Sequence, residues 1–376
     1  MAEKQLLIVC GEASGDLNAA NLAREILKSN SNIKIFAVGG PQLAQARAEV
    51  FYDIKELSVI GLFDALKKLP KFLGLKKIVL DKIKAVKPDA VIFVDFSGFN
   101  LRLAKKINNS LPTIYYISPQ VWASRPGRIR TIKKYISKMI VLFKFEEEFY
   151  KKFDMDVDCV GHPLLDIAKS TMSQKELTLN LGFYDNKVTI ALLPGSRKQE
   201  IRKVLPVMLK TASLINKKRE AQFVIAKSPQ VDWEVYNQMI KDHLPEAKIV
   251  EGRTYDCLNI ADFALVCSGT ATLETAIMQK PFAVVYKMSL LNYLLYRPQV
   301  KLPYIGMVNI VAEKEVVPEF IQFSATPKKI ADKTLEILSD PKALQQIKNS
   351  LAQVKASLGE KGASSRAAKI ILDFLK

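Results

Sequence analysis

Short runs of apolar residues alternate along the first half of the chain with segments whose apolar residues recur every three or four positions. The first run, KQLLIVC, predicts a strand, and the stripe from Ala19 to Leu27 that follows it has the spacing of one helix face. Further runs lie in KIFAVGG, DAVIFVDF, TIYYIS and MIVLFKF. They are nearly continuous rather than alternating, which is typical of parallel strands covered on both faces. This half therefore predicts a doubly wound α/β domain.

The same alternation restarts in the second half. After CVGHPLLD, the polar stretch KSTMSQKELTLN predicts a passage between domains, and KVTIALLPGS, AQFVIAKS, AKIVEG, DFALVC and PFAVVYK predict a second set of strands. We expect two Rossmann-like domains, residues 1–165 and 166–349, whose sheets face a cleft with their carboxyl ends. The tail from about Pro327 has a helical pattern, and we expect its last segment, residues 350–376, to pack back on the first domain.

Length and composition agree with two cytosolic domains. A chain of 376 residues, 49% of them hydrophobic, is long enough for two cores. The apolar runs have strand length and stay well short of the about 18 residues that span a bilayer. The first run is also too short for a signal peptide. The 4 cysteines are scattered without a C-x-x-C pair, so we expect reduced thiols in a cytoplasmic protein.

The net charge of +18 indicates an anionic partner without identifying it. An anionic membrane surface, a phosphorylated substrate and nucleic acid all fit, and so does a generally basic solvated surface. The sequence has no helix-turn-helix, zinc-finger or RNP-like pattern, so we expect no nucleic-acid partner.

The turn in LLPGSRKQE joins a predicted strand to a predicted helix. We expect Ser196 to cap that helix with Gln199 as its capping-box partner, and the unpaired N–H groups there suit an anion. Arg197 adds a planar cation that matches phosphate oxygens. The alternative is a helix that is simply well capped.

A second turn, CSGTATLETA, has the same form. Ser268 and Gly269 follow a strand, Thr270 opens a helix, and Glu274 could accept hydrogen bonds from a ribose diol. Two anion-binding turns in one domain predict a site for a nucleoside diphosphate. Neither turn has the P-loop pattern or G-x-G-x-x-G, which argues against ATP hydrolysis and against a nicotinamide cofactor.

A third turn, GEASGD, follows the first strand. Gly11 and Gly15 are expected to turn the backbone sharply and to let it approach a ligand closely. Ser14 and Asp16 can cap the next helix, which leaves Glu12 as the candidate for contact with substrate hydroxyls.

Two apolar segments predict contacts with lipid or with another subunit. Between Gly61 and Lys77, lysines alternate with apolar residues, which is typical of a helix in a membrane interface and also of an ordinary helix packed on a sheet. The expected membrane or acyl-chain patch consists of Phe63, Leu66, Leu69, Phe72 and Leu73. The connector LLNYLLYRPQVKLPYIGMVN is apolar enough to form a subunit contact, as in a homodimer.

Eight stretches occur in a characteristic order from residue 11 to beyond residue 310: GEASGD, VDFSGFN, YYISPQVWA, FEEEFYKKF, GHPLLD, LLPGSR, SGTATLE and LPYIGMVNIV. In this combination the chain resembles the lipid-A-disaccharide synthases, which are inverting glycosyltransferases with the two-domain GT-B fold. The resemblance implies that UDP-2,3-diacylglucosamine donates its sugar to the 6-hydroxyl of 2,3-diacylglucosamine 1-phosphate. The products would be a β-1,6-linked disaccharide phosphate and UDP. It also implies a peripheral protein of the inner membrane in a bacterium with an outer membrane.

The resemblance further implies roles for residues at matching positions. Asp95, at the end of a predicted central strand, would be the general base; it could otherwise cap the helix beginning near Asn100. His162 is a second candidate for the base or an orienting residue, or else a structural histidine near the domain passage. The UDP-sugar site would comprise Gly195, Ser196, Arg197, Ser268, Gly269, Thr270, Ala271, Glu274 and Asn309. The turn on the acceptor side would comprise Gly11, Glu12, Ser14, Gly15, Asp16, Ser118 and Gln120.

Three arginines after the SPQVWA segment are candidates to bind the acceptor phosphate: Arg125, Arg128 and Arg130. No cofactor or metal ion is expected, although DMDVD, from Asp154 to Asp158, contains an Asp-x-Asp that could bind one. The rival readings are another GT-B enzyme that uses a UDP-sugar, such as a MurG-like transferase or an epimerase, and a non-catalytic basic protein that binds membrane or nucleic acid.

Overall fold

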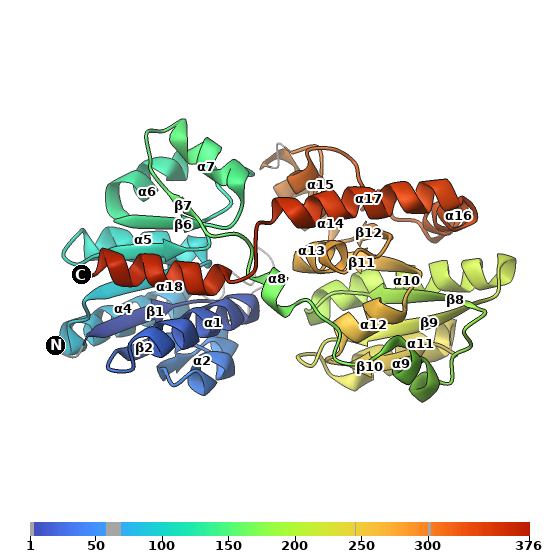
Figure 1. Ribbon diagram of the computed structural model, residues 1–376, viewed down its shortest axis with the longest axis horizontal. Coiled ribbons are helices and arrows are strands. Elements are labelled where there is room, and N and C mark those ends of the chain that lie inside the picture. The colour runs from blue at the N-terminus through green and yellow to red at the C-terminus, as the bar shows by residue number, and fades with distance from the viewer. Residues whose placement is uncertain (1–3, 58–68, 245, 300–301) are drawn as a thin grey trace. The chain divides into compact units, whose positions relative to one another are not determined.

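The computed structural model describes residues 4–57, 69–244, 246–299 and 302–376. The chain divides into two compact units, each with one parallel sheet and helices on it (Figure 1). The first unit comprises Met1–Pro163 together with Leu358–Lys376, and the second comprises Leu164–Ser357. The predicted α/β class, with two doubly wound sheets, is confirmed.

The sheet of the first unit has 7 parallel strands in the order β3-β2-β1-β4-β5-β6-β7. Strands β1 and β4 pair with Leu6 opposite Ala90, and both are almost completely buried, which explains their continuous apolar sequences. The strands are β1 (Gln5–Val9), β2 (Lys34–Gly39), β3 (Glu49–Asp53), β4 (Ala90–Val94), β5 (Thr113–Tyr116), β6 (Lys138–Val141) and β7 (Asp158–Cys159). The strand order reverses between β1 and β4, and in open α/β sheets ligands bind at such a switch point.

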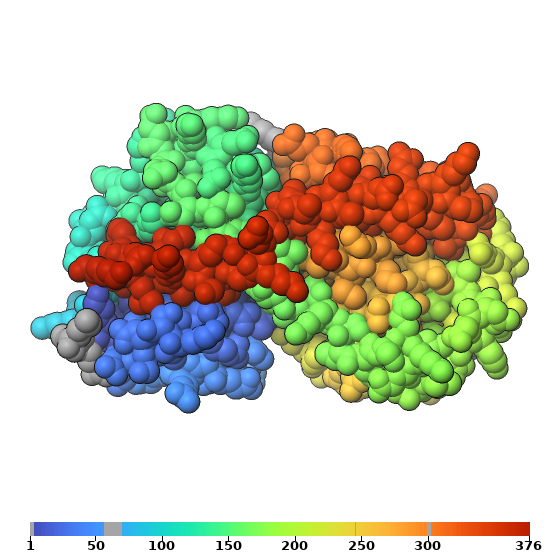
Figure 2. Space-filling model, in the orientation of Figure 1, coloured from blue at the N-terminus to red at the C-terminus, as the bar shows by residue number. Residues whose placement is uncertain are grey.

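Helices of the first unit connect these strands. They are α1 (Ala13–Ser29), α2 (Pro41–Gln45), η1 (Ile54–Leu57), α4 (Leu69–Val86), α5 (Ser97–Ile107), η2 (Pro126–Arg128), α6 (Ile129–Tyr135), α7 (Lys144–Lys151) and α18 (Ala363–Phe374). The last of them, α18, packs on α1 and lies along the surface of this unit, drawn in red over blue and teal segments (Figure 2). Its buried face includes Ala367, Ala368 and Ile371.

The second unit repeats the design with 6 parallel strands in the order β10-β9-β8-β11-β12-β13. The strands are β8 (Val188–Leu193), β9 (Ala221–Lys227), β10 (Lys248–Glu251), β11 (Phe263–Cys267), β12 (Phe282–Tyr286) and β13 (Glu319–Ile321). The switch point lies between β8 and β11, where Leu193 pairs with Val266. It is therefore the equivalent of the β1–β4 position in the first unit.

The helices of the second unit cover both faces of its sheet. They are α8 (Leu164–Ile167), α9 (Gln174–Leu181), α10 (Lys198–Lys218), α11 (Trp233–His243), α12 (Thr254–Ile260), α13 (Thr270–Ile277), α14 (Leu290–Tyr296), η3 (Arg297–Gln299), α15 (Met307–Ala312), α16 (Pro327–Ser339) and α17 (Pro341–Ser357). Within the described ranges, every helix is too short or too polar to cross a bilayer.

Three elements differ from the sequence-based expectation. The polar passage contains α9, which begins where the Ser173 hydroxyl accepts the Glu176 N–H at 3.2 Å. Strands β3 and β13 were not predicted, because both are edge strands whose residues are only partly buried. The helical tail after Pro327 is confirmed as α16, α17 and α18.

Candidate active site

The two glycines of the GEASGD turn lie against side chains of the first unit itself. A Cβ on Gly11 would lie 2.2 to 2.5 Å from ring atoms of Phe96, so only glycine fits under that ring. A Cβ on Gly15, which lies inside α1, would lie 3.3 Å from the Cys10 Cβ. The expected close approach of a ligand is therefore corrected: the Phe96 ring occupies the space at Gly11.

The acids and the serine of this turn also differ from the expectation. Helix α1 begins at Ala13 with Glu12 as its N-cap residue, so neither Ser14 nor Asp16 caps it. Asp16 is 2% exposed, and its carboxylate accepts the backbone N–H groups of Gly40, Gln42 and Leu43 at 2.7, 3.0 and 3.2 Å. It thereby caps α2 and ties β2 to α1. Ser14 and Glu12 have exposed side chains, and Glu12 makes no cap hydrogen bond.

Asp95 lies directly after β4, in a strained backbone. Asp95 and Phe96 both have left-handed conformations, with φ of 50° and 49°. Such a conformation costs a non-glycine residue about 1–2 kcal/mol. The Asp95 carbonyl accepts hydrogen bonds from Asn100 Nδ2 at 2.9 Å and from the Tyr115 hydroxyl at 2.5 Å, which hold it in place. Helix α5 begins at Ser97 with Phe96 as its N-cap residue.

Asn100 links the two strands of the switch point. Its side chain is fully buried, and Nδ2 also donates to the Val9 carbonyl at the end of β1, 3.3 Å away. Burial raises the pKa of the Tyr115 hydroxyl well above its usual value, and the Asp95 charge raises it further. The Tyr115 hydroxyl is therefore a neutral hydrogen-bond donor at neutral pH. The Asp95 backbone is thus fixed from β1 and from β5.

Arg128 is half-buried and contacts α5, which begins two residues after Asp95. Its Nη1 donates to the Ser97 hydroxyl at 3.0 Å, in the first turn of α5. Its pKa is lowered mainly by burial and also by the charge of Arg125. In turn, the Arg128 charge lowers the pKa of Tyr115. Arg125 and Arg130 are exposed.

Ser118 and Gln120 belong to the SPQVWA segment after β5. The Ser118 hydroxyl is buried and lies 2.8 Å from the Tyr150 hydroxyl of α7, whereas the Gln120 side chain is exposed. Glu146 fixes the same segment, because it accepts the Trp122 Nε1–H at 3.1 Å and the N–H groups of Leu142 and Phe143. Ser118 therefore has a structural role, and Gln120 is the accessible one of the two.

His162 lies in the interior of the first unit. It is 7% exposed, and its ring centroid lies 5.3 Å from that of Phe143. Its backbone N–H donates to the Leu358 carbonyl at 2.9 Å. Burial lowers the pKa of His162 to about 4. A buried, neutral ring packed against Phe143 fits a structural histidine better than a general base.

The expected membrane patch is only partly within the described residues. Phe63 and Leu66 lie outside them, and Leu69 begins α4 with a side chain that is not described. Leu73 is 52% exposed, as expected for such a patch. Phe72 packs inward instead, with its ring centroid 6.0 Å from Phe96 and 6.5 Å from Phe99.

In the second unit, the LPGSR turn follows β8 at the switch point. Gly195 has φ of 113°, which a residue with a Cβ rarely adopts, and a Cβ there would lie 2.9 Å from the Glu200 carboxylate. The N-cap of α10 is Arg197, without a side-chain cap hydrogen bond, so the capping box expected from Ser196 and Gln199 is not formed. Ser196 and Arg197 have exposed side chains. Arg197 Nη1 lies 3.1 Å from Glu200 Oε1.

The CSGT turn after β11 is the neighbour of the LPGSR turn. Both Glu200 and Arg197 act on the pKa of the Cys267 thiol, which burial raises strongly. Gly269 has φ of 143° and is the N-cap of α13, with Thr270 exposed and Ala271 partly buried at the start of that helix. The predicted pairing of the two turns in one place therefore agrees with the structure.

Glu274 lies on the second turn of α13, next to Tyr255 of α12. Its Oε1 accepts the Tyr255 hydroxyl at 2.7 Å. Burial raises the pKa of Glu274 above its usual value, and the hydrogen bond from Tyr255 opposes this effect. A desolvated carboxylate held by a tyrosine is a fixed acceptor for a hydroxyl pair.

Asn309 does not face a ligand in this structure. It is fully buried, its Nδ2 donates to the Val317 carbonyl and to Glu319 Oε1, and its Oδ1 accepts the N–H groups of Val316 and Val317. These bonds use the full capacity of an amide side chain. The expected contact with the donor is therefore corrected to a positioning role.

Glu319 connects Asn309 to the CSGT turn through hydrogen bonds. It accepts the N–H groups of Ile305 and Gly306, both at 2.9 Å, and the Ile305 carbonyl accepts the Ser268 hydroxyl at 3.1 Å. Ser268 is thereby tied to the same network, and burial raises the pKa of Glu319. Sequence reasoning missed Glu319; its signal was an acid inside the apolar stretch VVPEFIQF.

Other candidate positions take no part in these turns. In DMDVD, Asp154 lies 3.8 Å from Lys133, and Asp158 lies 2.5 Å from Lys138. Among the described residues, no group of three His, Cys, Asp or Glu side chains is placed to hold a metal ion. Cys10, Cys159, Cys257 and Cys267 are free thiols.

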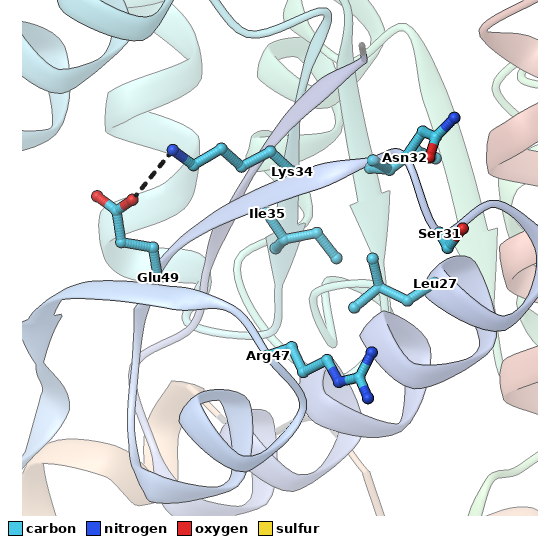
Figure 3. Close-up of a pocket in the computed structure, with 8 residues that line it drawn as sticks. Leu27, Ser31, Asn32, Lys34, Ile35, Arg47 and Glu49 are labelled. Atoms are coloured by element: carbon cyan, nitrogen blue, oxygen red, sulfur yellow. Dashed lines mark ion pairs between the residues drawn. The ribbon is translucent and has the colours of Figure 1, made fainter.

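A pocket in the first unit lies away from the switch point (Figure 3). Its walls include Leu27, Lys34, Arg47 and Glu49, and Lys34 forms an ion pair with Glu49 at 3.5 Å. Lys34 is the first residue of β2, so this pocket is at the amino end of the strands, opposite the edge that carries Asp95.

Each of the two parallel sheets carries its turns at a switch point, which is where open α/β folds bind their ligands. The structure resembles that of a UDP-GlcNAc 2-epimerase from Neisseria meningitidis bound to UDP-GlcNAc, with a TM-score of 0.64. The match covers 99% of this chain and 99% of that chain, at 15% sequence identity. A calicheamicin glycosyltransferase, CalG4, has a TM-score of 0.61 over 100% of this chain and 99% of that one, at 14% identity. At such identities the likeness shows the GT-B fold alone.

Sequence comparison identifies the family. The family model described as lipid-A-disaccharide synthetase matches residues 6–374. A lipid-A-disaccharide synthase from Syntrophus aciditrophicus (strain SB) is 41% identical over 380 residues, covering 100% of this chain and 99% of that protein. The chain belongs to the lipid-A-disaccharide synthase family, and it is a glycosyltransferase that forms the lipid A disaccharide. The prediction made from the eight stretches is confirmed.

Proposed function

We propose that the chain transfers the sugar of UDP-2,3-diacylglucosamine to the 6-hydroxyl of 2,3-diacylglucosamine 1-phosphate, with inversion and without a metal ion. The acceptor oxygen forms a bond to the anomeric carbon while the bond from that carbon to the UDP oxygen breaks. The hydroxyl proton passes to the Asp95 carboxylate, and the electron pair of the broken bond leaves with UDP. The use of a UDP-sugar is supported by the family and by the epimerase bound to UDP-GlcNAc that shares the fold.

The observation that carries this proposal is the fixed backbone of Asp95 at the switch point of the first sheet. A general base has to be held against one hydroxyl, and strain is tolerated where surrounding bonds determine the conformation. Here those bonds are the ones from Asn100 and Tyr115 to the Asp95 carbonyl. Glu12, whose exposed side chain lies at the neighbouring turn, supplies contact to the sugar hydroxyls.

The second unit holds the departing UDP. The N-terminal ends of α10 and α13 offer backbone N–H groups and positive dipole ends to the diphosphate. Arg197 adds a cation that neutralises the charge growing on the leaving group, which is the role a metal ion has in other transferases. Glu274 accepts hydrogen bonds from the ribose, and the network of Asn309 and Glu319 keeps the CSGT turn in place.

The acceptor phosphate is bound by Arg128, with Gln120 and the exposed Arg125 and Arg130 around it. The Arg128 side chain is anchored by the hydroxyl of Ser97, two residues after Asp95. The protein works at the cytoplasmic face of the inner membrane, because its substrates carry acyl chains. A homodimer is compatible with this assignment.

The direct test is release of UDP by the purified chain from the two acylated substrates in the presence of EDTA. We expect turnover under these conditions, and we expect none when UDP-GlcNAc replaces the acylated donor. Turnover of UDP-GlcNAc without an acylated acceptor would instead favour an epimerase. A requirement for a divalent cation would contradict the roles assigned to Arg197 and the helix ends.

A further inference from the structure

Helix α14 in the second unit exposes its apolar side. Leu290, Leu291, Leu294 and Leu295 are 53%, 51%, 60% and 39% exposed. Their spacing of one and four residues places them on one helix face, whereas Asn292 and Tyr293 are partly buried. A surface helix normally turns such a face toward the core.

Phe323 extends this face beyond the helix. It follows β13, is 69% exposed, and meets Tyr293 edge to face with ring centroids 5.7 Å apart. We call the four leucines and Phe323 the leucine face. Other large apolar side chains exposed on the described part of the second unit, such as Leu179 and Trp233, belong to other helices. Large apolar side chains that are exposed together on one short helix and on the loop that contacts it mark an interaction site.

Basic residues accompany the leucine face. The sequence has no Asp or Glu between Lys280 and Ala312, a stretch that includes Lys287 and Arg297. Lys287 is partly buried at the end of β12, and Arg297 is exposed directly after α14. Apolar side chains beside cations fit a surface that is apolar inside and anionic at its boundary.

The size of the leucine face argues against a second protein chain. A stable protein–protein interface uses about 20–30 residues from each partner. The leucine face has five large apolar side chains on a 7-residue helix and one loop. A bilayer has no such requirement, because insertion of a few side chains and attraction to headgroups add independently.

We propose that the leucine face binds the surface of an anionic lipid bilayer and inserts its side chains at the boundary of headgroups and acyl chains. This inference rests on the proposed function in one respect: acylated substrates reside in a membrane. It assigns the membrane contact to the second unit, distinct from the segment between Gly61 and Lys77.

The test is co-sedimentation of the full chain with vesicles of phosphatidylethanolamine and phosphatidylglycerol, and with vesicles of phosphatidylcholine alone. The variant is the triple substitution Leu291→Ser, Leu294→Ser and Phe323→Ser. We expect its partition onto the anionic vesicles to fall by about tenfold or more, since apolar area that enters the lipid is lost. Binding of the unaltered chain should weaken on phosphatidylcholine and at high salt.

A matched control separates the leucine face from exposed leucines in general. Leu179 of α9 is 68% exposed, close to the 60% of Leu294. We expect Leu294→Ser to lower vesicle binding and Leu179→Ser to leave it unchanged. Because both side chains are on the surface, these single variants also decide the question if the triple variant folds poorly.

Equal vesicle binding by the triple variant and the unaltered chain would overturn the inference, and so would an equal loss of vesicle binding in both single variants. A third contradicting outcome is that the triple variant changes from dimer to monomer in sedimentation velocity while its vesicle binding stays the same. The last would assign the face to a second copy of the chain. Release of UDP from detergent-dispersed substrates is measured separately. Its failure in the unaltered chain would contradict the proposed function while leaving vesicle binding as the measure of the leucine face.

Discussion

The switch points of the two units occupy the same place in their sheets, but their turns differ in backbone conformation and in the exposure of their side chains. After β4, a non-glycine backbone is held in a left-handed conformation by buried side chains from α5 and β5. After β8 and β11, glycines supply the unusual φ angles, and the side chains of Ser196 and Arg197 extend from the surface. A rigid turn suits a base that must meet one hydroxyl, and an open turn of N–H groups with a long cation suits a diphosphate.

The largest effect is expected when the proposed base after β4 is removed. We expect Asp95→Asn to lower kcat by about 10³-fold, because the loss of a positioned general base costs about 10²–10⁴-fold. The affinity for UDP, measured by calorimetry, should stay the same, because we assign the UDP site to the second unit. Near-normal turnover in this variant would remove Asp95 from the mechanism.

A smaller effect is expected from the open turn. Arg197→Ala should lower kcat/KM by about 10²-fold and also weaken UDP binding, since a cation aimed at the leaving group is lost. Arg197→Lys should recover part of the loss, because a lysine keeps the charge but not the planar fork. If Arg197→Ala bound UDP as tightly as the unaltered chain, the LPGSR turn would not be the diphosphate site.

Asn100 tests whether the rigidity after β4 matters. We expect Asn100→Ala to lower kcat by about tenfold through a misplaced Asp95, with KM unchanged, and to lower the free energy of unfolding by about 1–3 kcal/mol. Tyr115→Phe removes the other hydrogen bond to the Asp95 carbonyl and should act in the same direction. A merely structural role would lower stability in both variants and leave kcat per folded molecule unchanged.

His162 should affect stability rather than chemistry. Because burial lowers its pKa to about 4, the unfolded chain binds a proton that the folded chain does not between about pH 6.5 and pH 4. In this window the free energy of unfolding falls as the pH falls, by about 3 kcal/mol at its lower end for this residue alone. Denaturant titration of His162→Phe should show a flatter pH dependence. A variant with normal stability but no activity would return His162 to the list of bases.

The sequence predicted the buried half of the fold better than its edges. Strands β1, β4, β8 and β11 are continuous apolar runs because helices cover both of their faces. Strands β3 and β13 lie at sheet edges with partly exposed residues and carry no such signal. The helix in the polar passage was missed because its single buried residue, Leu177, gives no apolar stripe.

At the candidate site, the sequence predicted the positions of the turns but not the hydrogen bonds that stabilise them. Asp95 and Arg197 follow apolar runs; the family resemblance also indicated Asp95, and the planar charge of its side chain indicated Arg197. Asn100, Tyr115 and Glu319 act through hydrogen bonds to residues on other elements, which no local pattern reveals. The same reason explains Asp16 and Asn309. Asp16 was expected to cap α1 and to belong to the acceptor-side turn, and Asn309 was expected near the donor, whereas the fold uses both side chains to accept backbone N–H groups.

In the proposed mechanism the two switch points have different roles: the second unit binds UDP, and the first unit carries the base. Amide hydrogen exchange with and without UDP measures this division in one experiment. Protection by UDP at residues 195–200 and 268–272, with residues 94–100 unchanged, is the predicted result. Protection at residues 94–100 without any at the LPGSR and CSGT turns would contradict the claim.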